Sequence, residues 1–191
     1  QLFNFQAYFS YLKKYFINSF NKWHLKKILV LSDTHGYLDD KIIKYVNQSD
    51  EVWHAGDIGS LEVLKKLEEK SFFRGVYGNI DNHLLRKSLS EFEIFEIDKL
   101  KFLLIHIAGN PKNLSSKVKN LVNFHRPNVL VCGHSHILKV EFLKSKNILY
   151  LNPGAAGKFG FHKIRTMIKF EIINQAVENM NIIELGNRSK I

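Results

Sequence analysis

The stretch over residues 26–36, KKILVLSDTHG, joins an apolar strand to a pair of polar side chains. Residues 28–31 favour a β-strand, which ends at Ser32. Asp33 and His35 follow two positions apart, so an extended backbone directs both side chains to the same side. A carboxylate oxygen and an imidazole nitrogen offered together suit a divalent metal ion. Because an Asp after a strand also commonly caps a helix, this stretch indicates a metal site only if later strands end in the same way.

Composition is that of a single globular domain. The chain has 191 residues, of which 45% are hydrophobic and 24% charged, and this length is enough to bury a full hydrophobic core. The one cysteine, Cys132, cannot form an internal disulfide, which fits a reducing compartment, and we expect a cytoplasmic protein. No apolar run approaches the roughly 18 residues of a transmembrane helix.

The formal net charge of +10 favours anionic partners. Phosphorylated small molecules, nucleic acids and acidic membrane surfaces are the classes concerned. The lysines are spread along the chain rather than gathered in blocks, so we attribute most of this charge to a solvated surface that keeps the protein soluble.

The first 25 residues differ from the rest because aromatic and leucine side chains recur there at three- and four-residue steps, as in an amphipathic helix. These side chains are Phe5, Phe9, Leu12, Phe16, Phe20 and Trp23. Three interpretations fit: a helix packed on the main domain or on a second copy in a homo-oligomer, a helix lying on a membrane surface, or a leader without stable structure. We favour the first, and predict an extension over residues 1–25, one domain over 26–186 and a tail over 187–191.

From residue 26 onward, strand patterns alternate with helix patterns, which is typical of βαβ units with parallel strands. The expected strands cover residues 28–31, 51–54, 72–77, 91–97, 101–105, 128–132, 137–143, 148–151, 165–173 and 177–185. One helix is expected after the capping residue Asp39, one after Ser60, and one over about residues 115–124. Residues 152–154, Asn-Pro-Gly, are expected to form a turn.

Five successive strands end in side chains of metal-ligand type. They are Asp33 with His35, Asp57, Asn79, His106, and His134 with His136. Active sites of open α/β sheets lie at the carboxyl ends of the strands, so we expect these seven side chains to gather at one site. A capping carboxylate or a hydrogen-bonded imidazole explains any one of them, but not five in succession.

The order D-x-H, G-D, G-N-x-D, H and G-H-x-H resembles the calcineurin-like metallophosphoesterases. The short length and the Asn-Pro-Gly segment resemble their small bacterial branch, the YfcE-type phosphodiesterases. Over about residues 26–185, the resemblance implies a single-domain α/β sandwich of two mixed β-sheets flanked by helices. It also implies two divalent metal ions, one held by Asp33, His35 and His136, the other by Asn79, His106 and His134, with Asp57 bridging both. Mn²⁺ is the metal that the family suggests, and Zn²⁺, Fe or Ni²⁺ also suit these ligands.

Two such cations about 3.5–4 Å apart can hold a bridging hydroxide and clamp a phosphate for in-line attack. The resemblance therefore implies a metal-dependent phosphoesterase that prefers a phosphodiester to a monoester. The residues that would bear on catalysis are Asp57, Asn79, Asp81 and His83, with Asp81 expected to orient the site.

Ile80 is a departure from the family pattern, since many relatives have a His there that acts as a general acid. An isoleucine cannot donate a proton, which leaves less help for a poor leaving group and agrees with a diester preference. His83, three positions later, could replace that acid, but we favour a surface position for it. A second departure is Ile107, which stands after His106 where relatives often have Gly.

Two other functions on the same fold compete with this hypothesis. A non-catalytic protein-interaction scaffold, such as the retromer scaffold subunit, has lost full metal competence, whereas all seven ligand positions are filled here. A nuclease would use the basic charge, but nucleases of the superfamily usually add a DNA-binding region and keep the His that Ile80 replaces. We therefore expect a phosphorylated small molecule as the substrate, and no nucleic acid partner.

Several further residues of reactive or charged type are expected to have structural rather than catalytic roles. His54 and Cys132 are expected to be buried and packed rather than reactive. Arg74 and Arg165 could each meet a phosphate, but no spacing singles either of them out.

Overall fold

Strand β1 (Lys26–Leu31) has side chains that alternate between two hydrophobic layers. Ile28 and Val30 enter the layer between two β-sheets, where they join a buried cluster from both sheets. Leu29 and Leu31 enter the opposite layer, which lies beneath two helices. In the computed structural model, which describes residues 25–161 and 163–188, this alternation places β1 inside the molecule with an apolar layer on each side.

The first sheet has five strands in the order β12-β11-β1-β2-β3. Its other members are β2 (Glu51–His54), β3 (Phe72–Gly75), β11 (Ile164–Ile173) and β12 (Ala176–Asn187). Strands β1, β2 and β3 run parallel, whereas β11 pairs antiparallel with β1 and β12 pairs antiparallel with β11. The parallel part agrees with the expected βαβ arrangement, and its carboxyl ends all reach the same edge of the sheet.

The second sheet also has five strands, in the order β4-β5-β8-β10-β9. They are β4 (Phe92–Ile97), β5 (Leu100–Ile105), β8 (Val129–Val131), β9 (Leu138–Leu143) and β10 (Ile148–Pro153). Strands β5, β8 and β10 are parallel, and the outer strands β4 and β9 are antiparallel to their neighbours. Both sheets are therefore mixed.

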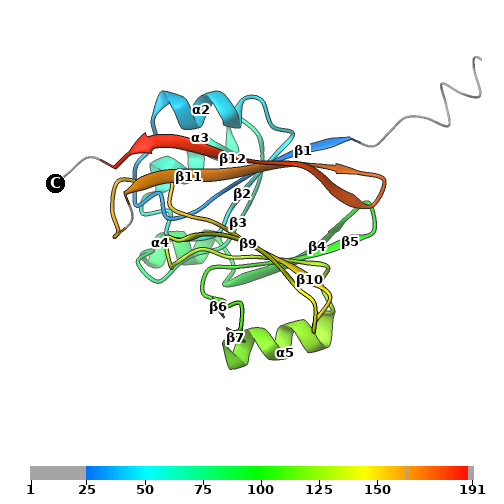
Figure 1. Cartoon of the computed structure of the whole chain (residues 1–191). Coiled ribbons are helices and arrows are strands. Elements are labelled where there is room, and N and C mark those ends of the chain that lie inside the picture. Colours follow the sequence, from blue (N-terminus) through cyan, green and yellow to red (C-terminus); the bar gives the residue numbers. More distant parts are fainter. Residues whose placement is uncertain (1–24, 162, 189–191) are drawn as a thin grey trace, which may run out of the picture.

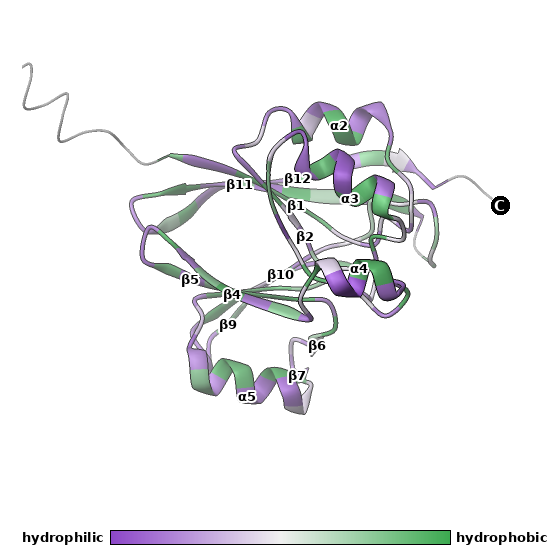
Figure 2. Ribbon diagram, turned by 180° about the vertical axis from the view of Figure 1, so that it is seen from behind, coloured by the Kyte–Doolittle hydropathy of each residue, from purple (hydrophilic) through white to green (hydrophobic). Residues whose placement is uncertain are grey.

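Helices cover the outer face of each sheet (Figure 1). The helices α2 (Asp40–Val46) and α3 (Leu61–Glu68) pack on the first sheet, and α5 (Ser116–His125) packs on the second. In Figure 2, α3 and α5 carry both apolar and polar residues, as expected of helices that bury one face. The predicted fold class, an α/β sandwich of two mixed sheets flanked by helices, is confirmed.

Side-chain capping explains where the longer helices begin. Asp39 accepts a hydrogen bond from the backbone N–H of Ile42 at 3.0 Å, and Ser60 accepts one from Val63 at 3.3 Å. Both caps were expected from the sequence, and the third helix begins immediately after its cap, Ser115.

The sequence did not predict three short elements, because they are too short to produce a periodic pattern. They are α4 (His83–Ser88), which Asn82 caps, and the two-residue strands β6 (Gly109–Asn110) and β7 (Asn113–Leu114). The expected turn over residues 152–154 is wrong. Asn152 and Pro153 belong to β10 and pair with β9, and the chain turns at Gly154, whose φ is +74°.

Trp53 forms the centre of the layer between the sheets. Its ring meets those of Phe95, Phe102 and Phe170 edge to face, with centroids 5.0, 4.8 and 5.5 Å away. The indole N–H donates to Glu51 at 3.0 Å, so the one polar atom of this large side chain is satisfied. Glu51 is only 2% exposed, and its carboxylate therefore needs further partners.

Those partners are two cations at the end of the layer. Lys26 and Arg74 both donate to the Glu51 carboxylate, Arg74 at 3.0 Å, and the Arg74 guanidinium lies 4.2 Å above the Phe95 ring. Burial by itself raises the pKa of the Glu51 carboxyl, but the hydrogen bonds from Lys26, Trp53 and Arg74 outweigh it and lower that pKa overall.

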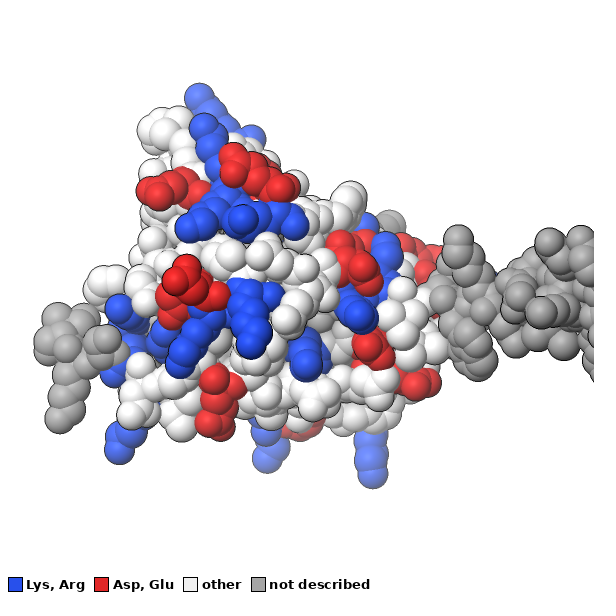
Figure 3. Space-filling view, turned by 90° about the horizontal axis from the view of Figure 1, so that it is seen from above, with Lys and Arg blue, Asp and Glu red and all other residues white. Residues whose placement is uncertain are grey.

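The surface seen from above carries Lys and Arg interspersed with Asp and Glu (Figure 3). This pattern agrees with a solvated, mixed-charge surface. Within the part of the chain that the structure describes, no helix is long and apolar enough to cross a membrane. The amphipathic helix expected within residues 1–25 lies outside the described residues, apart from residue 25, and the predicted domain bounds stay a prediction.

Substituting Glu51→Gln tests this buried cluster. We expect the free energy of unfolding at pH 7 to fall by about 1.5–3 kcal/mol, the range for hydrogen bonds to charged groups. Because folding lowers the pKa of Glu51, its contribution is present above the ordinary value of 4.5 and is lost as the pH falls through the folded value. Urea unfolding between pH 3 and pH 7 should thus show a shallower acid loss for the variant. Equal slopes for the two proteins would contradict the account.

Candidate metal centre

Five of the seven residues expected at the site have an unusual backbone conformation, with positive φ. Asp33, His35, Asp57, His134 and His136 have φ values of 54°, 49°, 56°, 69° and 57°, in the left-handed region that non-glycine residues seldom adopt. Each such conformation costs about 1–3 kcal/mol, and such residues cluster at functional sites. The concentration of strain here marks the strand ends as a candidate site independently of residue type.

A first group of ligand-type side chains joins the ends of β1 and β8. Asp33 Oδ1 lies 3.1 Å from His136 Nε2, and the Nε2 atoms of His35 and His136 are 3.3 Å apart. One ligand atom from each of these three residues lies within 4.8 Å of the others. The family resemblance implied this group, and the fold brings its members together although His35 and His136 are 101 positions apart.

A second group lies beside the first. Asn79 Oδ1 is 3.0 Å from His106 Nε2 and 2.8 Å from His134 Nδ1, so the amide oxygen faces both rings. His106 is buried, whereas Asn79 and His134 are exposed. The exposed side of this group is where a ligand from solution can reach it.

Asp57 lies between the two groups. Its Oδ1 is 3.2 Å from His106 Nε2, and its Oδ2 is 4.0 Å from His35 Nε2, so each oxygen faces one group. Asp33 is also near both, since Asp33, Asp57 and His106 have ligand atoms within 4.8 Å of one another. Each carboxylate accepts one backbone hydrogen bond, Asp33 Oδ2 from His134 at 3.1 Å and Asp57 Oδ1 from Ile80 at 3.0 Å. We regard Asp57 as the better candidate bridge, because its two oxygens face the two different groups.

The buried ring of His106 is fixed in one tautomer. Its Nδ1 lies 2.7 Å from the carbonyl oxygen of Ala55, which can only accept, so Nδ1 carries the proton. Nε2 faces two acceptor oxygens, Asp57 Oδ1 and Asn79 Oδ1. Burial lowers the pKa of His106, but the hydrogen bond with Asp57 and the nearby Asp33 carboxylate outweigh it and raise that pKa overall. Nε2 therefore holds a proton more readily than an ordinary imidazole and gives it up when a metal ion binds there. A backbone carbonyl that orients a histidine in this way is characteristic of metal sites.

Two glycines allow the strand ends to approach so closely. A Cβ at Gly78 would lie 2.0 Å from Asp57 Oδ1, and one at Gly56 would lie 2.6 Å from the His106 ring. Gly56 also has a φ of +92°. Any side chain at either position would displace a candidate ligand.

Asp81, which is expected from the sequence to orient the site, makes its side-chain hydrogen bonds with backbone groups rather than with the candidate ligand side chains. Its carboxylate accepts hydrogen bonds from the backbone N–H groups of Ile58, Gly59 and Gly78 at 3.2, 2.7 and 2.7 Å. It thereby ties the loop after β2, which carries Asp57, to the loop that carries Asn79.

Asn152 has a comparable role that the sequence did not reveal. Its side-chain N–H groups donate to the Gly133 carbonyl at 2.8 Å and to Ser135 Oγ at 3.1 Å. These contacts fix the loop that carries His134 and His136. An Asn within an apolar strand could have indicated this role in the sequence. The role was missed because Asn152 was assigned to a turn over residues 152–154 rather than to the strand.

His54 is buried beneath the site, as expected. Its Nδ1 accepts from the backbone N–H of Gly56 at 3.2 Å, so Nε2 carries the proton and donates to Thr34 Oγ1 at 2.9 Å. Burial lowers the pKa of His54 to about 4, which keeps the ring neutral. Through Thr34 and Gly56, His54 contacts the two loops that carry the candidate ligands Asp33, His35 and Asp57.

The remaining polar candidates lie elsewhere. His83 is the exposed first residue of α4, and its side chain makes no hydrogen bond or ion pair with any described residue. Arg74 pairs with Glu51 and Arg165 pairs with Asp39, so both guanidinium groups serve the fold. Cys132 is a buried thiol, and its burial raises the pKa well above the ordinary value.

Two observations fit the presence of metal ions. Asp33 Oδ1 is buried and makes no hydrogen bond of good geometry with a described residue, and its near neighbour His136 Nε2, at 3.1 Å, is itself a ligand-type atom, so a cation would bind both. Burial also lowers the pKa values of His35 and His134, which favours the neutral imidazoles that bind metals. The donor set of carboxylates, imidazoles and one amide suits Mn²⁺, Zn²⁺, Fe and Ni²⁺ alike.

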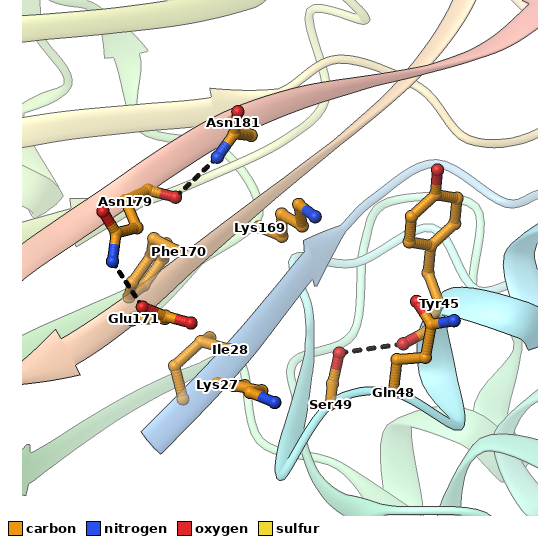
Figure 4. A pocket seen from close by; sticks show the side chains of 10 residues that line it. All are labelled: Lys27, Ile28, Tyr45, Gln48, Ser49, Lys169, Phe170, Glu171, Asn179 and Asn181. Atoms are coloured by element: carbon orange, nitrogen blue, oxygen red, sulfur yellow. Dashed lines mark hydrogen bonds between the residues drawn. The ribbon is translucent and has the colours of Figure 1, made fainter. Parts of the chain in front are cut away.

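A separate cavity of about 480 Å³ lies away from these residues (Figure 4). It is lined by Lys27 and Ile28 at the amino end of β1, by Tyr45 and Ser49 at the end of α2, and by residues of β11 and β12 such as Lys169. The candidate centre is at the carboxyl end of β1, so this cavity belongs to another part of the molecule.

An α/β sandwich that brings two carboxylates, four imidazoles and an amide oxygen together at its strand ends has the architecture of a metal-dependent hydrolase. The chain belongs to the calcineurin-like phosphoesterase superfamily, because the sequence profile of that superfamily domain matches residues 27–175. The resemblance in the sequence is thus confirmed, and the class of activity that it supports is a metal-dependent phosphoesterase.

Individual relatives agree with this assignment. A probable metallophosphoesterase of Mycoplasma pneumoniae is 35% identical over 136 residues, which cover 69% of this chain and 79% of that one. The structure of an archaeal phosphodiesterase is similar with a TM-score of 0.67 and 26% identity, over 83% of this chain and 99% of that one. Vps29 of Chaetomium thermophilum has a TM-score of 0.67 at 14% identity, over 86% and 100% of the two chains, and shows a shared fold.

Substituting Asn152→Ala tests how much the buried amide contributes to the centre. The variant removes the two hydrogen bonds that the Asn152 amide donates to the loop over residues 133–136. We therefore expect Mn²⁺ binding to weaken about 10- to 100-fold, as when a residue that orients ligands is lost. Isothermal titration calorimetry measures this affinity. The matched control is Asn128→Ala, which removes a single hydrogen bond to Lys101. Equal affinities in the two variants would contradict the assigned role.

Proposed function

We propose that this protein is a dinuclear metal-dependent phosphodiesterase. The observation that carries the proposal is the position of Asp57, whose two carboxylate oxygens face two separate groups of ligand-type side chains. One bridging carboxylate between two neutral imidazole groups offsets the repulsion between two cations and leaves the site net positive. Such a site attracts an anionic ester, and the substrate we propose is a phosphorylated small molecule.

Each group has a distinct part in this proposal. Asp33, His35 and His136 would hold one ion, and Asn79, His106 and His134 the other. When bound, the two ions would activate a water molecule and polarise the phosphate oxygens, with Mn²⁺ as the metal that the family suggests. Asn79 offers a neutral amide oxygen, which binds a cation less strongly than a carboxylate, so its ion should exchange faster.

The diester preference rests on what the site lacks near the leaving group. Ile80 is 46% exposed where a general acid would be needed, and the exposed His83 side chain makes no hydrogen bond or ion pair with a described residue. Without a proton donor, expulsion of a poor leaving group is slow, so the site should favour substrates whose leaving group departs as a stabilised anion. The archaeal phosphodiesterase among the relatives supports the same choice.

A non-catalytic scaffold is the second candidate, because Vps29 shares the fold. Strained backbone at five ligand positions favours a metal-binding role. A Vps29 structure from Entamoeba histolytica also holds Zn²⁺, so metal binding alone does not distinguish the enzyme from the scaffold. An assay of phosphoester hydrolysis with and without added metal distinguishes the two functions, because only the enzyme hydrolyses a substrate.

The metal-free protein should hydrolyse nothing, and added Mn²⁺ should restore cleavage of bis-p-nitrophenyl phosphate more than of p-nitrophenyl phosphate or single-stranded DNA. In that assay we expect Asp57→Asn to lower kcat/KM for the diester by about 10²-fold or more, as when a charge-stabilising group is lost. His83→Ala should change it little, because His83 is exposed and its side chain makes no hydrogen bond or ion pair with a described residue.

Comparable losses in both variants would identify His83 as an acid and overturn its surface assignment. Absence of turnover with all three substrates, together with absence of bound metal, would replace the enzyme by the scaffold.

A further inference from the structure

Two cavities open beside the second group of candidate ligands. The smaller has a volume of about 300 Å³ and is lined by Asn79 and His106, together with Tyr77 and Lys117. The larger has a volume of about 520 Å³ and is lined by His134, together with Lys112, Ile137 and Tyr150. Ligand sites in proteins have volumes of about 300–1,000 Å³, so each cavity can hold an organic group.

Among the residues that the structure describes, Ile107 alone lines both cavities. It follows His106 directly, and its side chain is 44% exposed. The neighbouring Ala108 is buried and its carbonyl accepts from Ser115 at 2.9 Å, so the segment that carries Ile107 is anchored. Ile107 therefore separates the two cavities at the rim of the candidate centre.

The linings of the two cavities have the same character. The smaller contains the ring of Tyr77, over which the Arg86 guanidinium lies at 4.5 Å. The larger contains Ile137, which is 63% exposed, and Tyr150, whose hydroxyl donates to Gly109 at 3.1 Å. Apolar or aromatic surface with a few polar groups suits an uncharged organic substituent, such as a nucleoside or an aryl group.

Most of the charged side chains in the two linings are held by other groups. The Arg86 guanidinium in the smaller cavity donates to the carbonyl oxygens of Gly78, Asn79 and Asp81. Lys117 pairs with Glu91, and Lys139 pairs with Glu141 at 2.9 Å. Lys112 has no side-chain partner among the described residues, and it lies on the larger cavity only.

We propose that the two cavities take the two ester substituents of a phosphodiester, one on each side of Ile107, with the larger substituent in the larger cavity. A tetrahedral phosphodiester directs its two substituents away from each other, whereas a monoester has one and would leave a cavity empty. This inference rests on the proposed function and specifies its substrate class: a diester in which one substituent has about the size of a nucleoside. Binding of that substituent would supply energy for the reaction at phosphorus.

The test compares two diesters with the same leaving group. Thymidine 5′-(p-nitrophenyl phosphate) and ethyl p-nitrophenyl phosphate both release p-nitrophenolate, so the ratio of their kcat/KM values reports the second substituent alone. For the full chain with Mn²⁺ we expect a ratio of about ten or more in favour of the nucleoside diester.

Substituting Lys112→Trp fills the larger cavity and should lower this ratio to about three or less, while the matched Lys112→Gln keeps it, since it removes the charge without adding bulk. Lys117→Trp fills the smaller cavity and should lower kcat/KM for both diesters alike, relative to Lys117→Gln. Circular dichroism confirms that each variant is folded.

A wild-type ratio near one would overturn the inference without any variant, and so would equal ratios for Lys112→Trp and Lys112→Gln. In both cases hydrolysis of the two diesters would leave the proposed function standing. Hydrolysis of neither diester by the wild-type protein would overturn the proposed function and this inference together.

Discussion

Backbone hydrogen bonds between the loops after β1 and β2 are the constraint on which the site depends. Asp33 N–H donates to the Gly56 carbonyl and His35 N–H to the Asp57 carbonyl, both at 3.0 Å, beyond the last paired residues of the strands. They hold two candidate ligand segments in register while the residues adopt left-handed conformations. Asp81 and Asn152 then bring in the segments that carry Asn79, His134 and His136.

The strained and polar site residues lie at the strand ends, outside the hydrophobic layers that stabilise the fold. Three hydrophobic layers, one between the sheets and one beneath each set of helices, surround the strands on both faces. Burial in those layers fixes the strand positions, so their carboxyl ends can carry polar and strained residues. The polar cluster around Glu51 lies at the opposite, amino end of β2, where it satisfies Trp53 without disturbing the site.

Much of this arrangement could be predicted from the sequence, and what could not has physical reasons. The strand ends were recognisable because apolar runs stop at Asp33, Asp57 and His134, and the caps Asp39 and Ser60 fixed two helix starts. Helix α4 was missed because six residues give no period, and Asn152 was misassigned because Asn-Pro-Gly is a common turn signal. The two cavities beside Ile107 arise from tertiary packing and have no local pattern.

Diffraction from crystals grown with Mn²⁺, measured at a wavelength that gives manganese anomalous scattering, tests the central claim most directly. The account predicts two anomalous peaks about 3.5–4 Å apart, one among Asp33, His35 and His136 and the other among Asn79, His106 and His134, with Asp57 between them. A single peak, or a pair of peaks with Asp57 outside both coordination shells, would contradict it.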